Sequence, residues 1–189
     1  MMELSNRTLG DWLEHWAETT PDKEYIVYSD RNLRFTWGKF NERVDNMAKG
    51  LLSIGVERGT HVGIWAGNVP DWLTFLYACA KIGAVAVTVN TNYKQSELEY
   101  LCKDSDMHTL CIVDGDRGNN DFVKMVYAML PELRTCQRGY LKSEKFPMMK
   151  NVVYIGQEKY RRSSLCRRAG NTPLAVCFCS FLRRTQPKL

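Results

Sequence analysis

Residues 61–93 read HVGIWAGNVPDWLTFLYACAKIGAVAVTVNTNY, and this stretch decides the fold of the 189-residue chain. Val62–Ala66 is a short apolar run with the length of a buried strand, and Ala84–Val89 is a second run of the same kind. Between them, apolar side chains recur at helical spacing, at Trp72, Phe75, Leu76, Cys79 and Ile82. Strand, helix and strand within about thirty residues predict a βαβ unit whose parallel sheet is buried on both faces.

The ends of the central helix carry their own signals. Asn68 is suited to cap its start, and Pro70 falls in the first turn, where proline is tolerated. Gly83 is suited to end it, because glycine accepts the left-handed backbone conformation that other residues resist.

Upstream of this unit, Thr8 and Thr36 each precede a helical apolar pattern. A polar turn at 29–32 between two short apolar runs predicts a hairpin. Trp12 and Trp16 share the apolar stripe of the first helix, which could be a membrane or partner face but which we expect to face the core.

Downstream, further strands and helices alternate. The expected elements are a helix that begins with a capping box at Ser96 and Glu99, a strand at Thr109–Val113, a helix at 122–130 and a strand at Val152–Ile155. This alternation predicts an α/β fold with a doubly wound, mostly parallel sheet and right-handed crossovers.

Composition narrows the class of protein. The chain is 44% hydrophobic and has no apolar run of about eighteen residues, so we expect a packed core and no transmembrane segment. The N-terminus lacks the apolar core of a signal peptide, which favours the cytoplasm. Cys79, Cys102 and Cys111 lie in apolar runs, so we expect them to be buried, reduced thiols. With three histidines and no Cys-x-x-Cys pair, we expect no metal site.

The net charge of +5 comes from one end of the chain. Residues 162–189 hold six basic and no acidic residues, whereas residues 1–161 hold 20 basic and 21 acidic residues. We therefore expect no nucleic-acid partner for the body of the protein, and we divide the chain into a domain at 1–161 and a basic, cysteine-containing tail at 162–189.

The tail has several interpretations. Its nine-residue apolar run, Leu174–Leu182, is too short to span a membrane but could form an interfacial anchor, or Cys177 and Cys179 could be lipidated. Because its composition changes abruptly, our hypothesis is that it is disordered or out-of-frame sequence appended to a truncated protein.

Three segments carry a family resemblance. Residues 77–85 read YACAKIGAV and close on Asn90–Tyr93, residues 33–37 read LRFTW, and residues 97–101 read ELEYL. In their order and spacing they resemble the N-terminal part of the adenylate-forming (AMP-binding) acyl-CoA synthetases, of the fatty acyl-CoA ligase type. The resemblance runs from about residue 9 to about residue 160, and it implies an incomplete N-terminal portion of that family's large domain.

The resemblance implies a two-step reaction, in which a fatty acid is adenylated by ATP with Mg²⁺ and then transferred to CoA. The family's Ser/Thr/Gly-rich phosphate loop and its Tyr-Gly-x-Thr-Glu segment are absent from these 189 residues. We therefore expect the chain to hold no catalytic residue, to bind none of these cofactors by itself and to be inactive alone. The resemblance places Asn90, Thr91, Asn92 and Tyr93 at the wall of the acyl pocket, as the expected substrate-binding residues.

Other candidates point elsewhere. Asp104, Asp106 and His108 could form an acid–base set, although a solvated turn explains them better. Asp114 follows a strand at the edge of a parallel sheet where ligands bind, but aspartate is also an ordinary loop residue. The alternative function is a non-enzymatic binding or dimerisation module that keeps half the fold, self-associates through exposed edges and uses the basic tail as an anchor. A small flavodoxin-like nucleotide-binding domain ranks last, because no phosphate loop follows Val62–Ala66.

Overall fold

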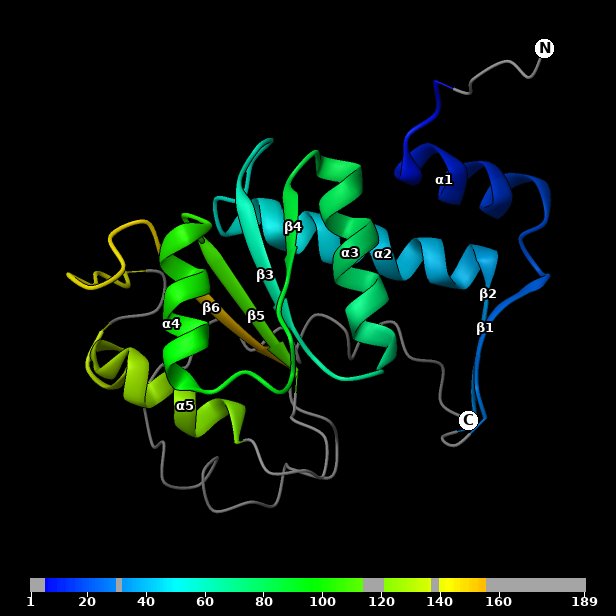
Figure 1. Ribbon diagram of the computed structural model, residues 1–189. Helices are drawn as coiled ribbons and strands as arrows, with labels where there is room; N and C mark the ends of the chain where they lie inside the picture. The colour runs from blue at the N-terminus through cyan, green and yellow to red at the C-terminus, as the bar shows by residue number, and fades with distance from the viewer. Residues whose placement is uncertain (1–5, 30–31, 114–120, 137–139, 156–189) are drawn as a thin grey trace, which may run out of the picture.

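The computed structural model describes residues 6–29, 32–113, 121–136 and 140–155, so Asp114 and the tail at 162–189 lie outside the described residues. Its centre is a four-stranded parallel sheet in the order β4-β3-β5-β6 (Figure 1). The strands are β3 (His61–Trp65), β4 (Val85–Thr88), β5 (Thr109–Val113) and β6 (Asn151–Ile155). The predicted parallel α/β sheet is therefore confirmed.

Helices cover both faces of this sheet (Figure 1). On one face, Val62 and Ile64 of β3 belong to a core shared with α2 (Trp37–Ser53) and α3 (Pro70–Ile82). On the other face, Trp65 belongs to a second core shared with α4 (Gln95–Asp104) and α5 (Phe122–Met129). Because successive side chains of a strand point to opposite faces, the continuous apolar run of β3 feeds both cores. The doubly wound arrangement is confirmed.

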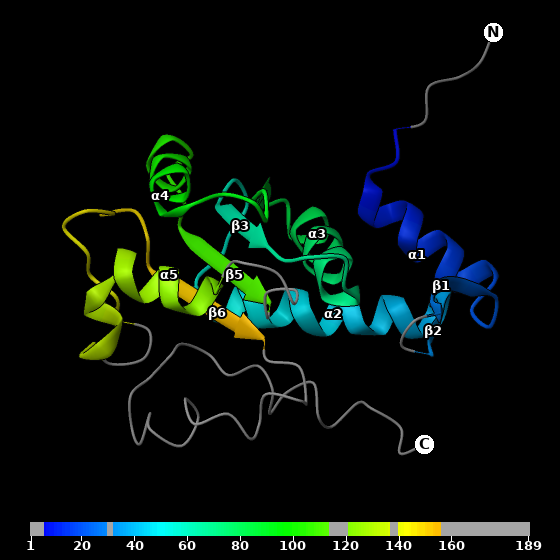
Figure 2. The same ribbon diagram turned by 60° about the horizontal axis from the view of Figure 1, so that its bottom comes forward.

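The N-terminal elements gather at one end of the molecule, opposite α4 and α5 (Figure 2). Helix α1 (Leu9–Thr19) is followed by the antiparallel hairpin of β1 (Glu24–Tyr28) and β2 (Leu33–Thr36), which forms its own two-stranded sheet. The predicted hairpin is therefore present. A short 3₁₀ helix, η2 (Pro131–Arg134), follows α5 and was not predicted.

Two predicted caps are wrong, for local reasons. The N-cap of α3 is the extended residue Val69 rather than Asn68, because the residue before a proline is pushed out of helical geometry. At α4, the Glu97 carboxylate accepts the N–H of Lys94 at 2.8 Å, so the helix begins before Ser96. By contrast, Gly83 ends α3 in the left-handed conformation, with φ of 71°, as predicted.

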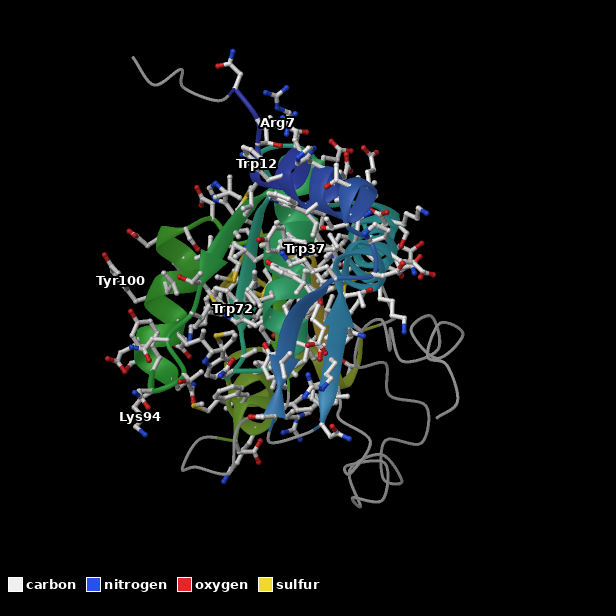
Figure 3. The ribbon with its side chains drawn as sticks, turned by 90° about the vertical axis from the view of Figure 1, so that its right-hand side faces the viewer. Arg7, Trp12, Trp37, Trp72, Lys94 and Tyr100 are labelled. Carbon is white, nitrogen blue, oxygen red and sulfur yellow. The ribbon has the colours of Figure 1, made fainter. Side chains whose placement is uncertain are left out.

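The prediction that the tryptophans of α1 face the core is also wrong. Trp12 and Trp16 remain 38% and 40% exposed, whereas Leu13 and Gly10 are buried. A Cβ added at Gly10 would lie 3.1 Å from Cγ of Lys81, so the glycine allows α1 to approach α3 closely along this line. The face centred on Leu13 and Gly10 therefore docks, and Trp12 lies at the outer side of α1 (Figure 3).

Gly63→Ala is expected to lower the free energy of unfolding by about 1–3 kcal/mol, the usual cost of overpacking. A Cβ at Gly63 would lie 2.4 Å from Sδ of Met107 and 3.1 Å from Cδ1 of Leu110. Both neighbours are fully buried, so the methionine end has little room to move. Urea denaturation measures the change. In a Met107→Ala background, which lacks the obstructing sulfur, Gly63→Ala should cost much less stability than in the wild type. An equal cost in both backgrounds would contradict this explanation.

Candidate functional site

An open pocket of about 430 Å³ lies where the carboxyl ends of β3 and β4 meet the hairpin. In parallel α/β sheets, ligands bind at this edge. The volume lies within the range of small-molecule sites, which is about 300–1,000 Å³. The described residues that line it are all uncharged: Tyr28, Ala66, Gly67, Asn68, Val69, Trp72, Leu73 and Thr91. The pocket therefore has a neutral, largely apolar lining, in which Asn68 and Thr91 are polar residues beside Tyr28.

The residues predicted as substrate-binding lie just after β4, but they have different surroundings. Of the four, Thr91 lines the pocket. The side-chain oxygen of Asn90 accepts the N–H of Asn92 at 2.9 Å, and its carbonyl oxygen accepts the indole N–H of Trp65 at 3.2 Å. Tyr93 packs against the core on the α4 side of the sheet. The structure thus brings Thr91 to the pocket and assigns Asn90 to the turn that holds it there.

The acid–base candidates lie at the opposite edge of the sheet. The N–H of His108 donates to the carbonyl of His61, the first residue of β3, at 3.0 Å. Asp104 and Asp106 are exposed, and Asp106 occupies a left-handed turn with φ of 45°. The solvated-turn interpretation therefore fits better than an acid–base set, and these residues do not reach the pocket.

His108 is expected to make the stability of the fold pH-dependent. Burial, together with the Lys150 ammonium, lowers the pKa of His108 below its ordinary value of 6.5, and Glu57 opposes this only in part. The folded protein thus favours the neutral imidazole, and the unfolded chain binds the proton more readily. The stability that the neutral His108 contributes to the fold is complete above pH 6.5 and is lost as the pH falls through the lowered pKa of His108.

The measurement is the urea midpoint of wild type and His108→Gln between pH 7.5 and pH 5. The wild type should lose stability over this range, and His108→Gln should lose less. His15→Gln, a change of the same kind on α1, is the matched control and should behave like the wild type. Equal pH slopes for wild type and His108→Gln would contradict this account.

Of the four described cysteines, three are buried and Cys136 is partly exposed. Cys79, Cys102 and Cys111 are buried, as predicted, and are free thiols. Burial raises the pKa of Cys79 and of Cys102 to about 12, so neither is a nucleophile at neutral pH.

Within the described ranges, no group of three or more His, Cys, Asp or Glu side chains could hold a metal ion. Nor does any helix in that part of the chain have the length and apolarity needed to cross a membrane.

Most of the pocket was missed by sequence reasoning. Gly67 and Val69 follow a predicted buried strand, so the rule that ligands bind at the carboxyl ends of parallel strands could have found them. Trp72 was assigned only to the apolar face of the helix, and Leu73 was not singled out. Tyr28 carries no such signal, because it reaches the pocket only through the docking of the hairpin.

Comparison with known proteins gives the family. The model of the AMP-binding enzyme family matches residues 13–179, which is most of the chain and extends past the boundary drawn at residue 161. A Bacillus subtilis protein named as an acyl-CoA synthetase is 45% identical over 159 residues, which cover 84% of this chain and 29% of that protein. The mitochondrial medium-chain acyl-CoA ligase of Bos taurus is 33% identical over 154 residues, 82% of this chain and 25% of the ligase.

The fold agrees with these matches. A crystal structure of a Rhodopseudomonas palustris protein named as a long-chain-fatty-acid CoA ligase superposes with a TM-score of 0.65 at 23% identity, over 82% of this chain and 34% of that one. The chain therefore spans about a quarter to a third of the length of the proteins it matches. Because the family model matches most of the chain and the fold agrees with that match, the chain belongs to the AMP-binding enzyme family.

Proposed function

We propose that this chain forms the acyl-facing, N-terminal part of an ATP-dependent fatty acid–CoA ligase. The observation that carries the proposal is the uncharged pocket at the carboxyl ends of the strands, which Thr91 helps to line. Family membership and the names of the relatives support the reaction class. An aliphatic chain suits a lining of aromatic and aliphatic side chains, because its burial there removes apolar surface from water.

In such a ligase, the carboxylate attacks the α-phosphate of ATP, pyrophosphate leaves, and the thiol of CoA then displaces AMP from the acyl group. The described residues around the pocket do not fit ATP or Mg²⁺, because they offer neither a carboxylate for the ion nor a cation for the phosphates. The role that we assign to this chain is therefore to bind and orient the hydrocarbon. ATP, Mg²⁺ and CoA are partners of the complete enzyme in this proposal.

Binding of decanoate to the chain, measured by equilibrium dialysis, tests the acyl site. The wild type should bind saturably. Leu73→Asp should weaken binding by about tenfold or more, because it places a charge against the hydrocarbon. Leu52→Asp, the same substitution at a residue of α2 that is 51% exposed, is the matched control. Absence of saturable binding, or an equal effect of both variants, would reject the site.

A second candidate function, a self-associating binding module, is favoured by the exposed face of α1. Trp12 and Trp16 lie there beside Leu9, which is 45% exposed. The strands β4 and β6 also form the two edges of the described sheet. Analytical ultracentrifugation should show a concentration-dependent dimer that Trp12→Gln/Trp16→Gln abolishes. The matched control is Tyr100→Gln, on the exposed side of α4 (Figure 3). A monomer at all concentrations would reject this function.

Two further parts of the proposal concern the tail and the compartment. We place the protein in the cytoplasm, and cell fractionation with a tagged chain tests this. We also propose that residues 162–189 are a separate segment, either out-of-frame sequence or a membrane-surface anchor. Sequencing of the coding DNA from the codon of Tyr160 distinguishes the two, since another frame that restores a Ser/Thr/Gly-rich loop would identify a frameshift.

A further inference from the structure

A largely buried cation contacts both elements that supply the pocket walls, helix α3 and the β1–β2 hairpin. Arg43 belongs to α2, and its side chain is only 16% exposed. Its Nε–H donates to Oγ1 of Thr74 at 3.1 Å, and its Nη2 donates to Oδ1 of Asp71. The two acceptors lie in the first turn and a half of α3, so one guanidinium holds this helix start at two points.

Trp72 and Leu73 form the α3 wall of the pocket, and they lie in the same helix start. Asp71 lies between Pro70 and Trp72, and its side chain is only 12% exposed. The Thr74 hydroxyl in turn donates to the carbonyl of Pro70 at 2.9 Å. The guanidinium is thus connected to the backbone from which Trp72 and its pocket-lining neighbours project.

The hairpin wall of the pocket, which Tyr28 forms, is connected to the same guanidinium through Phe35. Cζ of Arg43 lies 5.7 Å from the centroid of the Phe35 ring, a distance at which a cation and an aromatic face attract. Phe35 pairs with Ile26 in the β1–β2 ladder, two residues before Tyr28, the pocket residue that the hairpin supplies. One side chain therefore touches the supports of both walls.

We propose that Arg43 is a positioning residue that sets the separation of the two pocket walls and so determines which apolar groups fit. The inference rests on the proposed function for the identity of the ligand, but the clamp itself does not depend on it. The guanidinium is needed for its shape as well as its charge, because two separate nitrogens, Nε and Nη2, serve Thr74 and Asp71, whereas a lysine offers one nitrogen in another position. A lysine can hold Asp71 alone.

Arg43→Lys in the 189-residue chain tests the clamp by hydrogen–deuterium exchange with peptide resolution. The amides of residues 69–74 and 24–28 should exchange about tenfold faster or more, as expected for the loss of a charged hydrogen bond. The amides of β5, at 109–113, should be unchanged. Arg34→Lys is the matched control, because Arg34 forms an exposed ion pair with Glu24 on the same hairpin. It should leave both regions unchanged.

Decanoate dialysis provides the functional result. In Arg43→Lys, the affinity for decanoate should fall about tenfold while the urea midpoint stays close to that of wild type. Faster exchange spread evenly over 69–74 and 109–113 would show a merely structural role and overturn the proposal, and so would unchanged exchange at both pocket walls. If wild type binds no decanoate but the local exchange pattern appears, the clamp stands and the acyl site fails.

Discussion

Trp65→Ala is expected to lower the free energy of unfolding by about 3–5 kcal/mol, the range for removal of a large aromatic from a core. Trp65 is fully buried, and its ring stacks on Phe122 of α5 with centroids 3.8 Å apart. Its indole N–H donates to the carbonyl of Asn90. The substitution therefore leaves a cavity on the α4–α5 face and removes one of the two hydrogen bonds to the Asn90 carbonyl, which still accepts the N–H of Tyr93 at 3.1 Å. Urea denaturation followed by circular dichroism measures the loss.

Trp65→Phe separates the two contributions. Phenylalanine keeps a ring against Phe122 but cannot donate to Asn90, so it should cost much less than alanine while still loosening the turn at 90–93. Hydrogen exchange of this turn should rise in both variants. A Trp65→Ala protein within about 1 kcal/mol of wild type would contradict the packing described here.

Asp71→Ala is the second large effect, with an expected loss of about 3 kcal/mol or more, because it leaves a buried guanidinium without its carboxylate. Arg43 and Asp71 are 16% and 12% exposed in their side chains, so water cannot replace the lost partner in full. The contrast is the exposed pair Arg34–Glu24, whose side chains are 58% and 54% exposed. Glu24→Ala should cost about 1 kcal/mol or less.

A double substitution tests the reason for that loss. Arg43→Met/Asp71→Leu replaces both charges by apolar side chains and should recover most of the stability that Asp71→Ala loses, because the desolvation cost disappears with the charges. If the double variant is as unstable as the sum of Arg43→Met and Asp71→Leu, the pair does not interact as described.

The sequence predicted the sheet because its signals are local. Val62–Ala66 and Ala84–Val89 are apolar at every position, which is typical of strands buried on both faces, and Gly83 marks the helix end between them. The prediction of the two strands and that of the helix end each depend on a few neighbouring residues. The errors at the helix starts are also local, because the observed caps Val69 and Lys94 lie only one and two residues from the predicted caps.

The orientation of α1 could not be read from its pattern. The stripe of Leu9, Trp12, Leu13 and Trp16 is helical in period, but the period does not say which part of a wide apolar stripe docks. The close approach at Gly10 and the buried Lys81 ammonium, which lies 2.8 Å from Glu14, decide it. These contacts join segments far apart in the chain.

Only part of the pocket's lining could be inferred from local order in the sequence. Thr91 lies directly after a predicted strand, so its place at the sheet edge follows from local order. Tyr28 and Arg43 act through the docking of the hairpin on α2 and α3. No spacing in the sequence connects residue 28 or 43 with residue 71, which is why the second wall and its clamp emerge only from the structure.

In our proposal, this chain binds the hydrocarbon of the fatty acid for a ligase and does not catalyse adenylation by itself. The most direct measurement is decanoate-dependent exchange of labelled pyrophosphate into ATP by the 189-residue chain with Mg²⁺, beside a full-length acyl-CoA ligase as positive control. We expect no exchange above background, because the chain has no Ser/Thr/Gly-rich phosphate loop and no Tyr-Gly-x-Thr-Glu segment. Exchange that requires decanoate and saturates with it would contradict the account.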